Sequence, residues 1–232
     1  GLDLIPPLRP PACAIGFDLD GTLFDHRGSA TEAVLEFTAD LGYEPTPDRT
    51  AAWFDFEAEH FESWRAGAVT FTEQRRLRLR DYLRLLGANG PTEGRDLDEL
   101  FESYLTRYRR AWRAFPGVVS VLQELRDRGI RVGVLTNGSH EQQIDKLRVT
   151  GLASLVDVVC TSEDIGVAKP DPRAFEILAS RLGCTPSEML FIGDDLTLDV
   201  TAARAAGVAA AQVRHDRGGA MALDDAVRSA TL

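Results

Sequence analysis

Two carboxylates stand close together at the end of the first apolar run of the chain. Asp18 and Asp20 flank Leu19 directly after this run. Because side chains alternate along a strand, residues i and i+2 point to the same side, so both acids would face one place. They would repel each other and raise a pKa unless a divalent cation or a retained proton relieved the repulsion. A solvated turn is the plain alternative for a short Asp/Gly string taken alone.

Two further polar segments follow later in the chain. Thr136 and Asn137 come after the second apolar run and offer a hydroxyl and an amide suited to gripping a tetrahedral oxyanion. Taken alone, these two residues are also explained by an ordinary turn into a helix. Lys169 stands before Pro170 at a predicted helix start, where backbone N–H groups favour anions, although a lone loop lysine normally faces solvent.

A second group of acids follows the fourth apolar run. Asp194 and Asp195 come directly after that run, and Asp199 follows in the same segment. Hard divalent cations such as Mg²⁺ take oxygen ligands, commonly one or two carboxylates together with waters and substrate phosphate. Acids in this position are therefore candidates for holding such a cation.

Apolar runs and helical patterns alternate through much of the chain. Short, almost wholly apolar runs are typical of buried parallel strands, and several of the helical segments close with a glycine, where a helix C-cap belongs. The alternation predicts an α/β fold with a doubly wound parallel sheet. The expected strands are Ala12–Gly21, Ile130–Leu135, Leu155–Cys160, Met189–Ile192 and Val208–Val213, and the expected helices between them are Val118–Arg128, Glu141–Thr150, Arg173–Leu182 and Asp199–Ala206.

The segment from about residue 26 to residue 112 has a different pattern, with apolar residues at helical spacing and no convincing strand. Ser29 with Glu32, and Thr70 with Glu73, form capping-box patterns that each predict a helix start. We therefore expect an α/β core domain of residues 1–25 and 113–232, interrupted by a smaller all-helical cap domain of residues 26–112. The four expected cap helices are about Ser29–Leu41, Asp48–Arg65, Thr70–Leu86 and Asp96–Trp112.

Composition limits the possible partners. The 232 residues include 26 Lys and Arg against 36 Asp and Glu, which gives a net charge of −10. Nucleic acids and anionic membranes call for a basic surface, so we expect neither as a partner. Three cysteines without metal-ligand spacing, no long apolar stretch and no usual secretory signal predict a cytoplasmic protein. The start of the chain, residues 1–11, is expected to be an extended, proline-stiffened arm.

With these segments in place, the chain resembles the haloacid dehalogenase-like (HAD) hydrolase superfamily, in its phosphatase-type branch. The stretch from Phe17 to Asp25 is similar to the first motif of that superfamily, and Leu135–Gly138 is similar to the second. Lys169 with Pro170 resembles the third motif and Gly193–Asp199 the fourth, all in the expected order. The resemblance implies a Rossmann-like core with a helical cap inserted between the first two motifs.

The resemblance also implies a mechanism, that of a Mg²⁺-dependent phosphatase working through an aspartyl-phosphate. Asp18 would be the nucleophile that attacks phosphorus. Asp20 would be the general acid for the leaving oxygen and then the general base for the attacking water. Mg²⁺ would be bound by Asp18, by the backbone carbonyl of Asp20 and by Asp194.

Supporting roles follow from the same resemblance. Thr136 and the backbone of Asn137 would hold the phosphoryl oxygens, and Lys169 would balance the negative charge on nucleophile and phosphate. Asp199 would orient metal-bound water or Lys169. Asp195 departs from the small polar residue that is common after the metal ligand, so its part stays open.

Other functions remain to be weighed against a phosphatase. A sugar-phosphate mutase would share Asp18 and Asp20, with the cap deciding whether water or a sugar takes the phosphoryl group. A dehalogenase is disfavoured because dehalogenating relatives lack an Asp at the position of Asp20. A non-catalytic phosphate-binding regulator would also pair acids with a lysine, but receiver-like domains lack a long cap. The expected partner is a small phosphorylated metabolite of unidentified structure, bound by a monomer or a homodimer.

Overall fold

The computed structural model describes residues 13–215, so the proline-stiffened arm expected at residues 1–11 lies outside the described part. The chain divides into two compact units. The sheet unit contains the residues up to His26 together with those from Arg113 onward, and the helical unit contains Arg27–Trp112. The helical unit is thus an insertion into the chain of the sheet unit.

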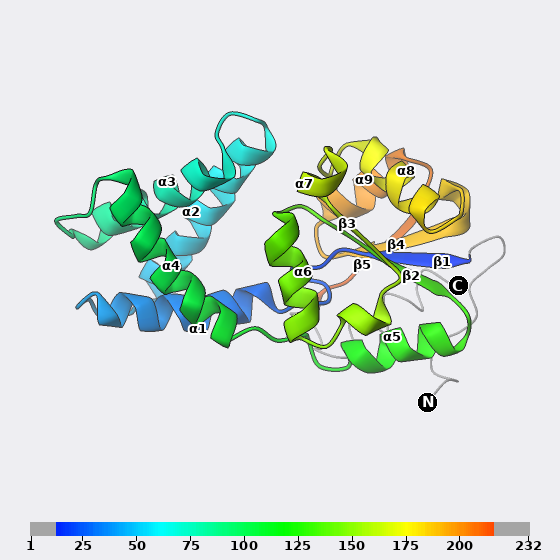
Figure 1. Ribbon diagram of the computed structural model, residues 1–232, viewed down its shortest axis with the longest axis horizontal. Helices are drawn as coiled ribbons and strands as arrows, with labels where there is room; N and C mark the ends of the chain where they lie inside the picture. Colours follow the sequence, from blue (N-terminus) through cyan, green and yellow to red (C-terminus); the bar gives the residue numbers. More distant parts are fainter. Residues whose placement is uncertain (1–12, 216–232) are drawn as a thin grey trace. The chain divides into compact units, whose positions relative to one another are not determined.

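The sheet unit is built on five parallel strands in the order β3-β2-β1-β4-β5 (Figure 1). The central strand, β1, pairs on one side with β2 and on the other with β4, so that Ile15 lies between Val132 and Leu190. The predicted doubly wound α/β sheet is confirmed. Its strands are β1 (Ala14–Phe17), β2 (Arg131–Thr136), β3 (Val158–Thr161), β4 (Met189–Gly193) and β5 (Ala209–Gln212).

Helices cover both faces of this sheet, with α5 and α6 on one face and α8 and α9 on the other (Figure 1). This arrangement explains why β1 and β4 are continuous apolar runs, since every residue of these two strands is buried. The helical elements of the sheet unit are α5 (Val118–Asp127), α6 (His140–Val149), α7 (Ser162–Ile165), α8 (Pro172–Arg181), α9 (Ala202–Ala205), the short 3₁₀ turns η2 (Ala153–Leu155) and η3 (Pro186–Glu188), and the π-helical turn η4 (Leu196–Thr201).

Two neighbouring glycines let α8 approach the middle of the sheet closely. Gly16 on β1 pairs with Gly133 on β2. A Cβ on Gly16 would lie 2.7 Å from Leu178 and 2.9 Å from Phe191, and one on Gly133 would lie 2.9 Å from Leu178. Real Cβ atoms essentially never come this close to another heavy atom, so a larger residue at either position would force the neighbouring side chains to shift.

The helical unit packs around aromatic side chains. Trp53 is fully buried, with its ring centroid 5.0 Å from that of Tyr82 and 4.6 Å from that of Tyr104, each pair inclined rather than flat. Such inclined contacts favour the positive edge of one ring against the negative face of another. The helices of this region are α1 (His26–Asp40), α2 (Pro47–Arg65), α3 (Phe71–Leu86) and α4 (Gly94–Arg110).

One of the two predicted capping boxes is wrong. Thr70 does cap α3, since its hydroxyl accepts from the Glu73 N–H and the Glu73 carboxylate accepts from the Thr70 N–H. Helix α1, however, already begins at His26, so Ser29 lies inside the helix and is buried. Its Oγ donates to the carbonyl of Ala111 at 3.0 Å, which satisfies an acceptor at the end of α4.

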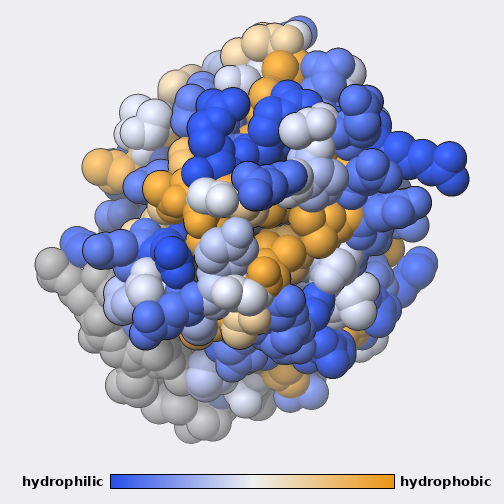
Figure 2. All heavy atoms as spheres, turned by 90° about the vertical axis from the view of Figure 1, so that its left-hand side faces the viewer, coloured by the Kyte–Doolittle hydropathy of each residue, from blue (hydrophilic) through white to orange (hydrophobic). Residues whose placement is uncertain are grey.

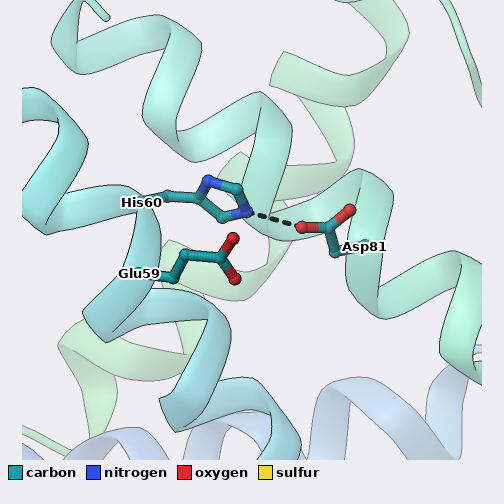
Figure 3. Close-up of side chains that lie close together, drawn as sticks. All are labelled: Glu59, His60 and Asp81. Atoms are coloured by element: carbon teal, nitrogen blue, oxygen red, sulfur yellow. Dashed lines mark hydrogen bonds and ion pairs between the residues drawn. The ribbon is translucent and has the colours of Figure 1, made fainter. Parts of the chain in front are cut away.

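A polar contact joins two helices of this unit. The Nε2 atom of His60 on α2 lies 2.5 Å from a carboxylate oxygen of Asp81 on α3, with Glu59 beside them (Figure 3). The face drawn in Figure 2 carries hydrophilic side chains around smaller groups of hydrophobic ones. Among the described helices, none is long and apolar enough to cross a membrane.

Candidate active site

The polar residues singled out from the sequence gather where the parallel strands end. Asp18 follows β1, Thr136 ends β2 and Asp194 follows β4. The chain builds the sheet outward from β1 in one direction and then continues from β4 in the other, so the strand order reverses between β1 and β4. Open α/β sheets bind ligands outside the carboxyl ends of the strands at such a reversal.

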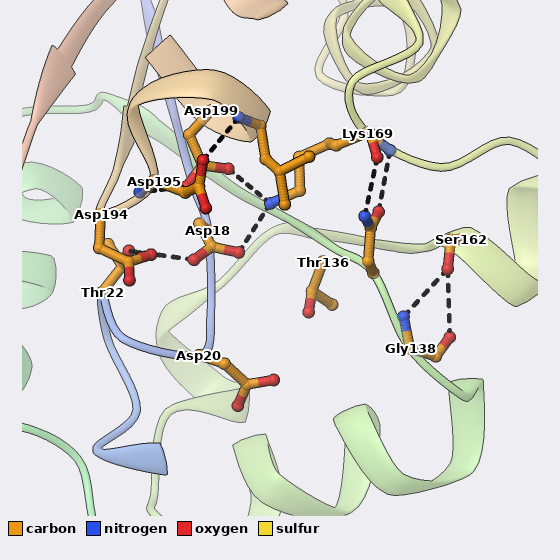
Figure 4. Close-up of polar contacts among 12 residues, drawn as sticks. Asp18, Asp20, Thr22, Thr136, Gly138, Ser162, Lys169, Asp194, Asp195 and Asp199 are labelled. Atoms are coloured by element: carbon orange, nitrogen blue, oxygen red, sulfur yellow. Dashed lines mark hydrogen bonds and ion pairs between the residues drawn. The ribbon is translucent and has the colours of Figure 1, made fainter. Parts of the chain in front are cut away.

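A buried ammonium links two carboxylates at this edge. Lys169 Nζ donates to Asp18 Oδ1 at 2.7 Å and to Asp199 Oδ1 at 2.7 Å (Figure 4). Only 3% of the Lys169 side chain and 1% of the Asp199 side chain are exposed. A buried charge is tolerated when it is paired and hydrogen-bonded, and here each of the three charged groups is.

Burial shifts the pKa values of these groups. It raises the pKa of Asp18 to about 7, with the nearby Asp194 carboxylate adding to the rise and Lys169 opposing it. Burial also raises the pKa of Asp199 to about 6, with Asp18 adding to it. Burial alone would lower the pKa of Lys169, but its attraction to both carboxylates outweighs this and raises that pKa. The lysine therefore stays charged while the carboxylates compete for a counter-charge.

Three carboxylates could share a cation at this edge. Ligand oxygens of Asp18, Asp194 and Asp199 all lie within 4.8 Å of one another. The Thr22 hydroxyl bridges two of these acids, 3.2 Å from Asp18 Oδ2 and 3.4 Å from Asp194 Oδ1. Both Asp199 oxygens already accept hydrogen bonds, one from Lys169 and one from the Asp195 N–H at 3.1 Å. Asp18 and Asp194 share the Thr22 hydroxyl and so have oxygens that face one place, which makes them the best candidates for a hard cation, and burial raises the pKa of Asp194 as well.

The structure gives Asp195 a local contact. Its Oδ1 atom accepts from the Thr197 N–H at 2.9 Å and from the Leu198 N–H at 2.8 Å. Asp195 is thus the N-cap of η4, the turn that carries Asp199. Its side chain fixes the start of that turn and is exposed to solvent.

The second motif contacts the Lys169 loop. The Asn137 side chain donates from Nδ2 to the Lys169 carbonyl at 3.0 Å and accepts at Oδ1 from the Lys169 N–H at 2.9 Å. Ser162 accepts from the Gly138 N–H at 3.0 Å, which ties the same turn to α7 (Figure 4). The sequence pointed to the Asn137 backbone and missed this side-chain clamp, because no spacing rule links residue 137 to residue 169.

Asp20 lies apart from the Asp18 cluster, and its side chain turns toward α6 (Figure 4). Lys146 Nζ lies 2.9 Å from Asp20 Oδ1, while Gln143 Nε2 donates to Asp20 Oδ2 at 3.0 Å and to Thr136 Oγ1 at 2.7 Å. Burial would raise the pKa of Asp20, but Lys146, then His26, and the two hydrogen bonds from α6 outweigh it and lower that pKa.

Lys146 and Gln143 are functional candidates that sequence reasoning missed. Both are buried, although polar residues of a surface helix usually face solvent. Their spacing of three residues places them on one face of α6, and that spacing was the available signal. The spacing does not reveal that this face of α6 turns toward the ends of the strands.

Comparisons with known proteins bear on this site. The chain matches the haloacid dehalogenase-like hydrolase family over residues 14–207. It is 31% identical over 208 residues to a ribulose-1,5-bisphosphate 5-phosphatase of Halopiger xanaduensis, which covers 85% of this chain and 82% of that protein.

Solved structures share the fold. A HAD-hydrolase of Bacillus subtilis bound to magnesium has a TM-score of 0.78 at 23% identity, with 89% of this chain and 90% of that chain covered. A defluorinating L-2-haloacid dehalogenase has a TM-score of 0.72 at 27% identity, with 89% and 85% covered.

Proposed function

Because the chain belongs to the haloacid dehalogenase-like hydrolase family, we propose that it is a Mg²⁺-dependent phosphatase that hydrolyses a small phosphomonoester through an aspartyl-phosphate. The observation that carries the proposal is the pair of acids after β1. Asp18 is buried and held by Lys169, and Asp20 is held separately by α6. Two carboxylates in different surroundings suit a nucleophile and a proton-transfer group.

The proposed reaction begins at Asp18. One carboxylate oxygen of Asp18 attacks phosphorus. The bond from phosphorus to the substrate oxygen breaks as Asp20, which has to take up a proton before this step because its pKa is lowered, gives that proton to the oxygen. Water then attacks the same phosphorus, Asp20 takes the proton from the water, and inorganic phosphate leaves with Asp18 regenerated. Lys169 stays beside Asp18 throughout and offsets negative charge on the transferred group.

Asp18 and Asp194, with the backbone carbonyl of Asp20, are the proposed ligands of Mg²⁺. The oxygen donors and the raised pKa values of the two carboxylates support a cation here. When bound, Mg²⁺ supplies positive charge that reduces the repulsion between these carboxylates and an anionic phosphoryl group. Thr136 and the Asn137 backbone are the proposed contacts of the phosphoryl oxygens.

Because a dehalogenase shares this fold, a residue is needed that distinguishes a phosphatase from a dehalogenase, and Asp20 is that residue. Displacement of a halide from carbon releases an anion that needs no proton, so a carboxylate at residue 20 would have no part in that step. In this chain Asp20 is held by two side chains of α6. A carboxyl group held in place two residues after the nucleophile favours cleavage of a bond to oxygen.

A panel of phosphomonoesters assayed with Mg²⁺ tests the proposal, with sugar phosphates, phosphoglycolate, phosphoserine and nucleotides as members. We expect inorganic phosphate to be released in step with the free alcohol from at least one member. A mutase would instead convert a sugar monophosphate to its isomer with little free phosphate and a need for a bisphosphate primer. Isomer formation without phosphate release would overturn the hydrolase assignment, and so would release of halide from a 2-haloacid without any phosphatase activity.

A further inference from the structure

Helix α6 contacts both oxygens of the Asp20 carboxylate. Lys146 Nζ approaches Oδ1 to 2.9 Å, and Gln143 Nε2 donates to Oδ2 at 3.0 Å. Only 3% of the Lys146 side chain is exposed, against 30% for Asp20. An ion pair with one buried member loses little to solvent screening, so this contact is stronger than a surface pair.

The same helix also contacts the second motif. Gln143 is 1% exposed, and its amide donates to Thr136 Oγ1 at 2.7 Å as well as to Asp20. A single planar amide therefore sets the separation between the Thr136 hydroxyl and the Asp20 carboxylate. Lys146 is held in turn by the face of the Phe24 ring, whose centroid lies 4.9 Å from its Nζ atom.

We propose that Lys146 and Gln143 are positioning residues, which fix the Asp20 carboxylate relative to Thr136 for proton transfer. This inference rests on the proposed phosphatase function and adds two residues to it. A carboxylate without these contacts is free to rotate about its side-chain bonds into solvent. Misplacement of a reacting group by about 1 Å can cost about 100-fold in rate, so the positions of these two donors matter although neither touches the phosphoryl group.

The substitutions Lys146→Met and Gln143→Leu test the proposal while keeping side-chain length: the first removes the ion pair with Asp20, and the second removes the hydrogen bonds to Asp20 and Thr136. Arg148→Met is the matched control for the first, since it removes a cation from an exposed position of the same helix. On an alkyl phosphate we expect kcat to fall about 10–100-fold in each variant, with KM within about 3-fold of the parent. The control should keep both parameters, and thermal unfolding should show that all variants are folded.

Two readouts separate positioning from a merely structural role. The first is the leaving group: formation of the phosphoenzyme from p-nitrophenyl phosphate needs little proton transfer, so this step should lose less than about 3-fold. The second is a double-mutant cycle with Asp20→Asn. Because Lys146 acts through Asp20, adding Lys146→Met to Asp20→Asn should lower kcat by less than about 3-fold further.

Each outcome decides one hypothesis. Equal losses with and without Asp20, or equal losses on alkyl and activated esters, would overturn positioning while leaving the phosphatase assignment intact. So would unchanged kcat in both Gln143→Leu and Lys146→Met. If Lys146→Met fails to fold, Gln143→Leu carries the test because it removes no charge. A wild-type protein without phosphatase activity on any ester would overturn the proposed function, and the inference with it.

Discussion

The charged side chain of Lys169 is deeply buried, and its charge is tolerated there because of the groups that surround it. Its ammonium contacts Asp18 and Asp199, and the Asn137 side chain holds its backbone on both sides. Removing one partner of such a buried pair leaves an uncompensated charge, which destabilises a protein more than the intact pair stabilises it. The same contacts that hold Lys169 therefore also orient the Asp18 carboxylate.

Asp18→Asn tests the nucleophile directly. The amide has nearly the same shape but cannot attack phosphorus, so we expect kcat to fall by about 10⁴-fold or more while the protein stays folded. Phosphate release on the best ester of the panel measures the change, with a thermal melt to verify folding. Asp195→Asn is the matched control, because asparagine also caps a helix and the Asp195 side chain accepts from two backbone N–H groups of η4. More than a few per cent of wild-type activity in folded Asp18→Asn would contradict the assignment.

The raised pKa of Asp18, about 7, predicts how stability depends on pH in metal-free protein. A carboxyl group whose pKa is raised in the folded state contributes stability below its ordinary pKa and loses it as pH rises through the folded value. Asp199, with a pKa raised to about 6, acts in the same direction. We therefore expect the melting temperature in EDTA to fall by about 3–6 °C between pH 5.5 and pH 8.

Asp18→Asn supplies the comparison for this pH effect, since groups remote from Asp18 titrate equally in both proteins and the variant also removes the contribution of Asp18 to the raised pKa of Asp199. The slope of melting temperature against pH should be smaller in the variant than in the wild type. Saturating Mg²⁺ should flatten the wild-type slope, because a cation replaces the proton. Identical slopes for both proteins in EDTA would contradict the shifted pKa of Asp18.

At the scale of elements, the site depends on how closely α8 packs on β1 and β2. The Leu178 side chain lies where a Cβ atom on either Gly16 or Gly133 would point, and these two glycines belong to neighbouring strands. Glycine in a strand weakens it, so its presence in two paired positions requires a packing reason, and the approach of α8 supplies one. Helix α8 starts at Pro172, shortly after Lys169, so the position of α8 affects the position of the loop that carries Lys169.

Gly16→Ala should therefore destabilise the sheet unit. The backbone at Gly16 does not adopt a conformation that only glycine tolerates. Alanine would therefore, apart from its contacts, stabilise the fold by reducing the conformational entropy of the unfolded chain. The added Cβ overlaps Leu178 and Phe191, so we expect the free energy of unfolding to fall by about 1–3 kcal/mol. Urea unfolding measures it. Combining Gly16→Ala with Leu178→Ala should cost less than the sum of the two single changes, and strict additivity would count against the overlap.

Sequence reasoning succeeded where residue type and position repeat a strong rule. Asp18 and Asp194 were correctly placed at one edge of the sheet, because residues directly after neighbouring parallel strands lie at the same edge. A local rule, the capping box, held at Thr70 but failed at Ser29. Ser29 matches a capping box, yet α1 begins three residues earlier and the Ser29 hydroxyl donates to the carbonyl of Ala111 instead, a partner that is distant in sequence. Lys146 was missed because an ordinary helix lysine and a buried one look the same in sequence.

At the scale of the whole molecule, net charge affects which ligands the protein attracts. A charge of −10 raises the local concentration of cations and lowers that of anions, so a phosphorylated substrate approaches against the general field. The buried lysine at Asp18 is one local compensation, and a bound divalent cation would be another. Binding of the anion is therefore expected to depend on prior binding of the cation.

Metal removal tests this dependence. EDTA should abolish phosphatase activity, and Mg²⁺ in excess of the chelator should restore it. Ca²⁺ should restore little, because it accepts more oxygen ligands than Mg²⁺ and lets Asp18 bind through both of its own oxygens, leaving no free nucleophile. Asp194→Asn should raise the Mg²⁺ concentration needed for half-maximal activity about 10-fold or more. Full activity in metal-free buffer would contradict the proposed cofactor.

The order of strands in the sheet also constrains biosynthesis. Strand β1 leaves the ribosome first, but its two neighbours are β2, which begins at Arg131, and β4, which begins at Met189. At about 5–20 residues per second, β1 waits roughly 9–35 s for its second neighbour. The intervening helical segment is complete well before that and has mostly local contacts, which form fast. A nascent chain therefore carries β1 with one edge unpaired until β4 has emerged, and the sheet edge that holds Asp18 and Asp194 assembles only after that.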